Sequence, residues 1–283
     1  MIPTIITPDN REHWLTLRTP NVNSTDTAAL FNLHGYCTFY ELWHYKNKSI
    51  AVDFQGNERT EWGLALQDSI AAKVANDKGW GSVRRMDEYM FLPEIKLGSS
   101  FDFAIGDDGI MEVKNVDKFI FLDEWTKKED GTYEAPLHIE IQVQTQLAVS
   151  NRKFAFIVAL IGGNEAIIIR RDRDESVISA ILEKTKWFWQ TIADKKEPTP
   201  DFAKDAEFIA KLYGYAEPEK VMEGGDHIKA LATEYKKVSE EIKPLEEKKD
   251  ALKAQMLIAI KDAEKCLGDG FTISAAWSCS AAS

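Results

Sequence analysis

Two acidic residues and a lysine, spaced as on neighbouring β-strands, are the residues of this chain best suited to chemistry. Asp102 precedes Glu112 by ten positions, and Lys114 follows Glu112 after one residue. Residues 106–109, Gly-Asp-Asp-Gly, favour a tight turn between alternating apolar and polar flanks, which predicts a β-hairpin. Glu112 and Lys114 then point to one face, because strand side chains alternate. Asp102 and Glu112 are nearly equidistant from the turn, so we expect them to pair at about 5 Å.

This arrangement can hold a divalent cation and hydrolyse a phosphodiester. Mg²⁺ takes oxygen ligands and keeps several waters, so two carboxylates and a substrate phosphate can complete its shell. The cation would act as a Lewis acid and generate hydroxide, while Lys114 orients or deprotonates the attacking water or neutralises charge on phosphate. The same spacing also occurs in surface hairpins with an ordinary ion pair. The neighbouring elements must therefore decide between the two interpretations.

Two helices supply further polar groups. Residues 61–75 have apolar side chains at helical spacing, and Gln67 falls at the edge of that stripe, so we expect it to point inward. Residues 138–150 form a second helix with three glutamines, of which Gln142 and Gln146 share a face. An unsatisfied buried amide costs about 1–3 kcal/mol. Backbone, water, metal-bound solvent and nucleic acid all remain open as partners.

Across roughly residues 10–195 the chain resembles the lambda-exonuclease-like (YqaJ-type) viral recombinases of the PD-(D/E)XK nuclease superfamily. Four motifs occur in the family's order. They are the opening segment Trp14–Arg18 with Ser24 and Thr25, the helix motif of Trp62, Gly63 and Gln67, the pair of elements Ser100–Asp102 and Glu112–Lys114, and Gln142–Gln144. The resemblance implies an α/β fold with a restriction-endonuclease-like core, in which helices flank a mixed central sheet.

The resemblance also implies roles for individual residues. Asp102, Glu112 and the backbone carbonyl of Val113 would bind Mg²⁺, for which Mn²⁺ would substitute, and Lys114 would serve the nucleophilic water. Gln142 would position this catalytic site.

A second group of residues would recognise the DNA end. Arg18, with Thr25 or Ser24, would hold the 5′-phosphate, because an arginine fork matches two phosphate oxygens.

Three positions depart from the family pattern. Phe101 replaces a proline and Phe103 a glycine, which alters the turn around Asp102 without removing the ligand. Gln67 stands where the family has a metal-binding glutamate, and a neutral amide is a weaker ligand for a hard cation. DNA cleavage would survive if one metal ion bound tightly or if water molecules bridged Gln67 to the metal. Otherwise cleavage would be lost. Glu61 is an acid nearby, but it lies on another face of the helix.

Composition limits the class of protein. The chain has 283 residues, a formal net charge of −11 and three widely spaced cysteines, which argues against a disulfide framework and a zinc cluster. We find no signal peptide and no apolar run long enough to span a bilayer, so we expect a cytoplasmic protein without membrane contact. The acidic balance predicts salt-sensitive DNA binding confined to a channel. Basic pairs that can line it are Arg84-Arg85, Lys127-Lys128, Arg152-Lys153 and Arg170-Arg171 with Arg173.

The remaining pattern predicts two domains. Residues 154–161 and 165–170 read as two strands joined by a tight turn, and residues 174–195 as a helix. We expect a nuclease domain over residues 1–200 and a helical extension over 201–283, because Pro198-Thr-Pro200 precedes a change in composition. From Ile228 apolar residues recur at a 3-4 spacing, which is typical of a coiled coil or helical hairpin. Pro244 lies within that stretch and favours a kink or two helices. Residues 268–277 can form a closing strand.

We therefore expect a Mg²⁺-dependent 5′→3′ double-strand DNA exonuclease of phage recombination that makes 3′ overhangs. The polarity, a single-strand annealing partner and a ring-like homo-oligomer come only from the resemblance. Two alternatives stay open. One is a structure-specific endonuclease of the same superfamily, and the other is a catalytically silent protein that binds DNA ends or serves assembly, for which Gln67 argues.

Overall fold

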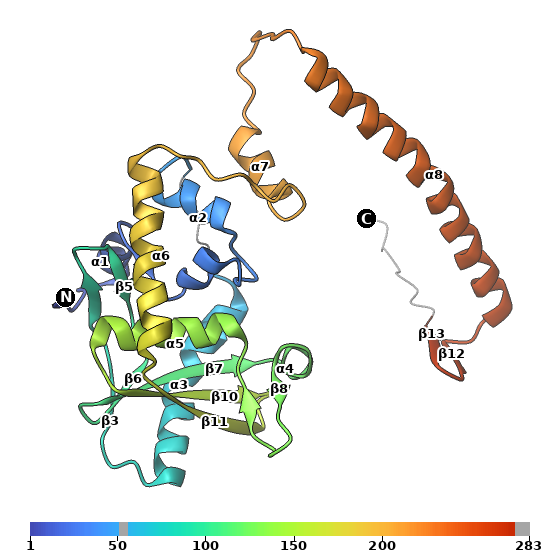
Figure 1. The fold of residues 1–283 in the computed structure, drawn as a ribbon. Coiled ribbons are helices and arrows are strands. Elements are labelled where there is room, and N and C mark those ends of the chain that lie inside the picture. Colours follow the sequence, from blue (N-terminus) through green and yellow to red (C-terminus); the bar gives the residue numbers. More distant parts are fainter. Residues whose placement is uncertain (51–55, 275–283) are drawn as a thin grey trace. The chain divides into compact units, whose positions relative to one another are not determined.

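The computed structural model describes residues 1–50 and 56–274, which fall into two compact units, Met1–Tyr215 and Ala216–Ser283 (Figure 1). Each unit is described by itself. No helix in the described ranges is both long and apolar enough to cross a bilayer. Cys37 and Cys266 are unbonded thiols, and Cys279 lies outside the described residues.

A five-stranded mixed sheet forms the centre of the first unit, with the strand order β11-β10-β7-β6-β3. The strands are β3 (Val83–Arg85), β6 (Phe103–Ile105), β7 (Gly109–Val116), β10 (Phe154–Ile161) and β11 (Glu165–Asp172). β7 and β10 run parallel, whereas the other neighbours are antiparallel. The two hairpins that the sequence predicts, β6–β7 and β10–β11, are both present. They meet at the parallel pair in the middle of the sheet.

A smaller sheet is built from short strands in the order β1-β4-β5-β2. These strands are β1 (Thr4–Ile6), β2 (Val22–Asn23), β4 (Tyr89–Leu92) and β5 (Leu97–Ser99). Two-residue strands β8 (Thr126–Lys127) and β9 (Tyr133–Glu134) form a separate ribbon. β5 ends immediately before Ser100, so the loop that contains Asp102 follows directly from this sheet.

Helices cover both faces of the central sheet (Figure 1). α3 (Glu58–Lys78) packs Ile70 and Val74 on one face, and α5 (Leu137–Ser150) packs Val143 and Leu147 on the other. The remaining helices of this unit are α1 (Arg11–Arg18), the 3-10 helix η1 (Thr27–Phe31), α2 (Phe39–Lys46), α4 (Lys118–Glu124), α6 (Glu175–Ala193) and α7 (Ala206–Tyr213). The expected α/β fold, a mixed sheet flanked by helices, is therefore confirmed.

Alternation along β7 sends its side chains to two different cores. Ile110 joins the cluster under α5, whereas Met111 and Val113 join the cluster under α3. By the same period of two, Glu112 and Lys114 face α5. The first apolar residue of the expected stripe on α3 does not pack, because Trp62 lies in the first turns and is 56% exposed.

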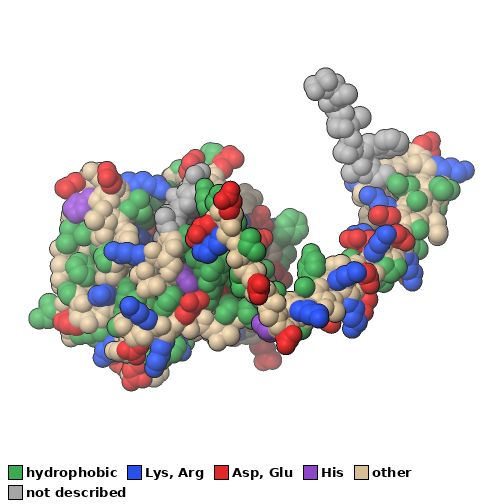
Figure 2. Space-filling view, turned by 90° about the horizontal axis from the view of Figure 1, so that it is seen from above, with side chains coloured by type: hydrophobic (Ala, Val, Ile, Leu, Met, Phe, Trp, Pro, Cys, Tyr) green, Lys and Arg blue, Asp and Glu red, His purple; other side chains and the backbone are tan. Residues whose placement is uncertain are grey.

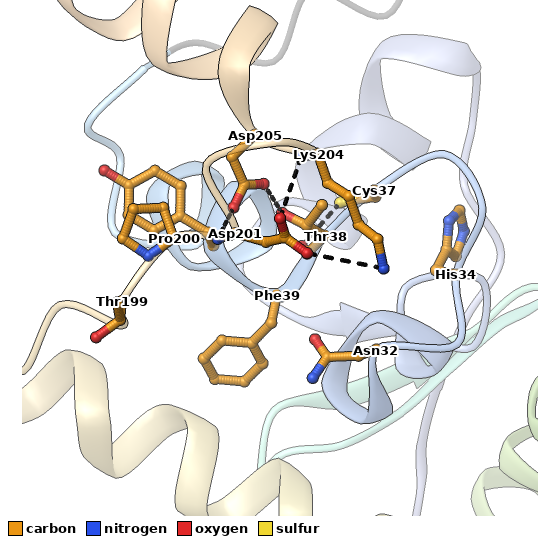
Figure 3. A pocket seen from close by; sticks show the side chains of 11 residues that line it. Asn32, His34, Cys37, Thr38, Phe39, Thr199, Pro200, Asp201, Lys204 and Asp205 are labelled. Atoms are coloured by element: carbon orange, nitrogen blue, oxygen red, sulfur yellow. Dashed lines mark hydrogen bonds and ion pairs between the residues drawn. The ribbon is translucent and has the colours of Figure 1, made fainter. Parts of the chain in front are cut away.

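The first unit extends past the boundary that the sequence suggested at residue 200. Asp205 is 1% exposed and accepts a hydrogen bond from the Thr38 hydroxyl at the start of α2 (Figure 3). Phe208 on α7 is buried against the rings of Tyr40 and Tyr45 on α2. These contacts attach α7 to the first unit, which ends at Tyr215. A composition change at a proline pair does not reveal such buried contacts.

The second unit consists of one long helix and a hairpin. α8 (Asp226–Ile260) continues through Pro244 as one helix, so the chain does not divide into two helices there. Proline forfeits one helical hydrogen bond at a cost of about 3 kcal/mol, which a helix rich in Lys, Glu, Leu and Ala tolerates. β12 (Lys265–Gly268) and β13 (Phe271–Ser274) pair antiparallel. β13 lies within the expected strand, of which residues 275–277 are outside the described ranges.

Candidate active site

Glu112 is the centre of a buried polar cluster on the α5 face of the sheet. Its side chain is almost fully buried, and both carboxylate oxygens accept hydrogen bonds. Oε1 accepts from Lys114 Nζ and from Gln142 Nε2, each at 2.7 Å. Oε2 accepts from Gln146 Nε2 at 2.7 Å. A buried carboxylate with three donors, one of them charged, is held in one orientation.

Gln142 and Lys114 complete a closed triangle with Glu112. Lys114 Nζ donates to Gln142 Oε1 at 3.0 Å, in addition to its contact with Glu112. The amide of Gln142 thus accepts from the lysine and donates to the glutamate at the same time. This orients the ammonium group towards the carboxylate.

Asp102 lies where the sheet is incomplete. β6 pairs with β7 only from Phe103 to Ile105, so β7 continues beyond its neighbour. The Val113 N–H donates to Asp102 Oδ2 at 2.8 Å. This hydrogen bond takes the place of the one that a neighbouring strand would accept at that position. The N–H and C=O of one residue in a strand point to the same side. The Val113 carbonyl therefore also faces the side on which Asp102 lies.

Gln67 reaches Asp102 from the opposite face of the sheet. Its Nε2 donates to Asp102 Oδ1 at 3.0 Å, and the side chain is half-buried on α3. The helix is fixed here by packing of Ile70 and Val74 one and two turns further on. Rotation of the amide would present an oxygen instead, since Gln carries both a donor and an acceptor.

The charges of the cluster interact strongly. Burial and the nearby Glu112 carboxylate raise the pKa of Asp102 to about 7, although the Val113 N–H and Lys114 act in the opposite direction. Burial lowers the pKa of Lys114, but Glu112 and Asp102 outweigh it and raise that pKa above its ordinary value. In this geometry the lysine is a charged donor. Two carboxylates whose repulsion disfavours ionisation are suited to a cation between them.

The donor chemistry fits a hard cation. Asp102 and Glu112 supply carboxylate oxygens, and Val113 and Gln67 supply neutral ones, which is the set that Mg²⁺ prefers. Gln146 Oε1 is buried and has no hydrogen-bond partner among the described residues, so one more oxygen acceptor is unsatisfied at the cluster. The described chain has no group of three or more His, Cys, Asp or Glu side chains placed to share a metal. A cation would here depend on two carboxylates and neutral oxygens.

Gln146 was not among the predicted site residues, yet it contacts Glu112 directly. It also donates to the Ser100 carbonyl at 3.3 Å, which links α5 to the loop before Asp102. The sequence signal that could have identified Gln146 is its spacing of four residues from Gln142, which places both side chains on one helix face. Gln144 turns the other way and bridges the Asp172 carbonyl and the Asp174 N–H.

The predicted end-binding residues gather around Ser100. Arg18 Nη2 donates to Thr25 Oγ1 at 3.1 Å, and Nη1 lies 3.4 Å from Ser100 Oγ. Trp14 donates to the same hydroxyl at 2.8 Å and lies under the guanidinium at 4.4 Å. Burial lowers the pKa of Arg18, which the nearby Asp26 partly offsets. Both hydrogen bonds of the guanidinium are made to hydroxyl groups, which leaves its charge available to a phosphate.

Ser24 lies apart from that guanidinium contact. Its side chain is 2% exposed, and its hydroxyl accepts from Ser99 Oγ at 2.8 Å. Thr25, by contrast, is exposed. The structure thus brings Arg18 and Thr25 together and places the Ser24 hydroxyl beneath the surface.

The predicted basic clusters are largely paired with acids. Ion pairs join Arg84 with Glu88, Arg85 with Asp68, Lys128 with Glu134, Lys153 with Asp108, Arg170 with Asp172, Arg171 with Glu140 and Arg173 with Glu175. In the face shown in Figure 2, basic and acidic side chains are interspersed. The exposed pairs among them contribute about 0–1 kcal/mol each, so phosphates can replace their acids. The pair of Arg171 and Glu140 is largely buried and bidentate.

A separate hollow of about 290 Å³ lies between α2 and the segment before α7 (Figure 3). Thr38, Asp201, Lys204 and Asp205 line it with Cys37. None of the carboxylates of the Glu112 cluster reaches it. It is therefore distinct from the candidate active site.

Comparison with known proteins decides the family. Residues 13–153 match the model of the YqaJ-like viral recombinase domain. This part of the chain is a YqaJ-like viral recombinase domain. The YqaJ protein of Bacillus subtilis (strain 168) is 26% identical over 261 residues, which cover 90% of this chain and 80% of that protein. The four motifs and the Glu112 cluster lie within the YqaJ-like domain, since its matched range includes Arg18, Gln67, Asp102 and Gln142.

Solved structures show the fold of the YqaJ-like chain. The alkaline exonuclease LHK-Exo from Laribacter hongkongensis superposes with a TM-score of 0.53 at 20% identity, over 71% of this chain and 99% of that one. Its complex with dAMP gives the same TM-score at 19% identity and the same coverage. Over the superposed part the chain therefore shares the fold of this alkaline exonuclease, a mixed sheet flanked by helices.

Proposed function

We propose that this protein is a Mg²⁺-dependent exonuclease that degrades double-stranded DNA from 5′ to 3′ and leaves 3′ single-stranded overhangs in phage recombination. The observation that carries the proposal is the convergence of Glu112, Lys114 and Gln142 beside Asp102. The family match and the exonuclease fold support the same conclusion. That LHK-Exo forms a complex with dAMP, a DNA monomer, is consistent with a nucleotide-sized product here.

Each residue of the cluster has a defined task in this proposal. Asp102, Glu112 and the Val113 carbonyl would hold Mg²⁺ or Mn²⁺, with Gln67 as a neutral fourth oxygen. When bound, the cation would supply Lewis acidity and lower the pKa of a water molecule. Lys114 is held as a charged donor by Glu112 and Gln142, so it orients the water and offsets negative charge developing on phosphate.

End recognition is assigned to the group around Ser100. Arg18 binds the 5′-phosphate with its fork, Thr25 adds a hydroxyl, and Ser24 supports this segment from below through Ser99. Ser100 lies two residues from Asp102, so phosphate binding and metal binding share one loop. This proximity favours cleavage close to an end over cleavage within a circle.

The proposal also includes an oligomer and a partner protein. A nuclease domain that reaches to Tyr215 acts on duplex ends as a ring-like homo-oligomer in the bacterial cytoplasm, and a single-strand annealing protein receives the overhang. The residues after Tyr215 form the extension.

A second candidate function rests on Gln67. In the geometry described, this residue donates a hydrogen bond to Asp102 where a glutamate would add a third carboxylate. A protein with a weakened metal site that still binds DNA ends would be a silent end-binding component.

Incubation with linear and covalently closed circular duplex separates these functions. The exonuclease degrades only linear DNA, needs Mg²⁺ or Mn²⁺, and is stopped by EDTA and by Glu112→Gln. Asp107→Asn, an acid-to-amide change on the exposed turn of the same hairpin, serves as the matched control and keeps activity. Nicked circles would establish an endonuclease. Binding of linear DNA without cleavage in either metal would establish the silent protein.

A further inference from the structure

The long helix α8 carries an apolar stripe that its own unit leaves exposed. The stripe recurs every three and four residues, and its members are between 42% and 78% exposed. They are Ile228, Leu231, Tyr235, Val238, Ile242, Leu245, Leu252 and Met256. In Figure 2 hydrophobic side chains appear between charged ones along the helical arm. The spacing is a heptad in which Ile228, Tyr235, Ile242, Lys249 and Met256 occupy one core position, and Leu231, Val238, Leu245, Leu252 and Ala259 the other.

A helix with this pattern requires a partner. At 1.5 Å per residue its 35 residues extend for about 52 Å, a length at which five heptads can interact. Pro244 weakens the isolated helix by about 3 kcal/mol, and most helix stability in proteins comes from packing of the apolar face. The stripe is continuous along the helix apart from Lys249. The other Lys and Glu residues of α8 lie on the remaining faces, where Leu257 and Ile258 near the C-terminal end are also exposed.

We propose that α8 pairs with α8 of a second copy of this chain as an antiparallel coiled coil with the two helices in full overlap. The proposal concerns α8 alone and does not depend on the nuclease function.

Charge excludes the parallel alternative. Consider a parallel pair of α8 helices. The residue that directly precedes the core position of Ile242 in one helix then lies beside the residue five positions later in the sequence of the other helix. Glu241 would then face Glu246, and Lys248 would face Lys253, each pair occurring twice. Lys249 would in addition meet its own copy in the core. Like charges held this way destabilise the pair.

One antiparallel register removes these conflicts. When Ile242 packs on Leu245 of the second copy and Tyr235 packs on Leu252, Glu241 lies beside Lys248, and the symmetry repeats this contact. Lys249 then lies against Val238 instead of another lysine. The ion pairs within α8 that the structure gives, Lys236 with Glu240 and Lys237 with Glu234, use neither Glu241 nor Lys248.

The same register aligns the helix with itself from end to end. Asp226 at the first turn lies opposite Lys261, just beyond the last turn, so nothing of α8 is left unpaired. The two-fold axis passes between Lys243 and Pro244. Pro244 occupies an outward position of the heptad, so its ring does not enter the interface. If the two helices were shifted by one heptad from this register, Lys248 would lie beside Lys248 of the second copy, and Glu246 beside Glu246.

The mass of the full-length protein in solution tests the pairing. Ile242→Asp introduces a charge into the core and should lower the assembly mass by half, whereas Ile258→Asp, the same change on the outer face, should leave it unchanged. Circular dichroism of both variants checks that helix content is retained.

A charge exchange tests the orientation without disturbing the core. Glu241→Lys should weaken association at least tenfold, and the added Lys248→Glu should restore it, because the two residues face each other only in the antiparallel pair. In a parallel pair Glu241→Lys would strengthen association, since it would then face Glu246. A monomeric wild type at micromolar concentration, unchanged mass in Ile242→Asp, or stronger association in Glu241→Lys would each overturn the proposal. A monomer whose stripe is protected from hydrogen exchange would mean that α8 folds onto its own chain.

Discussion

Replacing Asp102 with asparagine should make the metal-free protein more stable at neutral and alkaline pH. Burial and Glu112 raise the pKa of this carboxyl from 3.8 to about 7. A carboxyl with a raised pKa binds more protons in the folded than in the unfolded state. Its contribution to stability is therefore complete below about pH 4 and falls as the pH rises towards 7. Asparagine does not ionise, so the variant avoids this loss.

The size of the effect follows from the shift. About three pKa units at about 1.36 kcal/mol each set a ceiling of about 4 kcal/mol at pH 8. Water entering the partly exposed site reduces this, and we expect about 1–3 kcal/mol. Hydrogen bonding is retained in Asp102→Asn, because the amide oxygen of the new side chain can accept the Val113 N–H while Gln67 turns its own amide oxygen to the new NH₂ group.

Urea unfolding of both proteins in EDTA, at about pH 5 and pH 8, measures the effect. The gain of Asp102→Asn over wild type should be larger at pH 8 than at pH 5, and Asp107→Asn on the exposed turn should show no such difference. Addition of Mg²⁺ should stabilise the wild type and leave Asp102→Asn unaffected. Equal pH dependence in wild type and Asp102→Asn, or a less stable variant at pH 8, would refute the account of charge repulsion.

Four further outcomes are expected. Gln67→Glu should lower the Mg²⁺ concentration for half-maximal cleavage, because a carboxylate is the better ligand; an unchanged titration would remove Gln67 from the metal site. Arg18→Ala should abolish the preference for 5′-phosphorylated over 5′-hydroxyl duplex ends in matched digestions, and a variant that kept the full preference would contradict its role. Gln146→Leu should lower kcat by about 10–100-fold through misplacement of Glu112, with a smaller change in KM, which steady-state kinetics would resolve. Lys114→Ala should lose cleavage but retain metal-induced stabilisation in thermal unfolding, and loss of both would mean that it shapes the metal site itself.

Local patterns in the sequence were sufficient for the central elements. Glycine and aspartate in the turn indicated the β6–β7 hairpin, and helical spacing indicated α3 and α5. The spacing of Gln142 and Gln146 placed both amides on one face. These features depend on neighbours within a few residues, where periodicity is informative.

Contacts between distant segments could not be predicted in this way. That Gln146 binds Glu112, 34 positions earlier, depends on how α5 lies across β7. The small sheet β1-β4-β5-β2 has strands of two to four residues, too short for alternation to be recognised. The attachment of α7 depends on Asp205 and Phe208, which bury themselves against α2.

The mismatch in length between β6 and β7 gives the site a built-in spectroscopic probe. The amide proton of Val113 is held by the Asp102 carboxylate instead of a neighbouring strand. Its chemical shift and its exchange with solvent therefore depend on the state of that side chain, unlike those of amides within the ladder. Protonation of Asp102 or capture of its oxygens by a cation should move this one resonance. A single ¹⁵N-labelled amide would then report occupancy of the site in the absence of DNA or turnover.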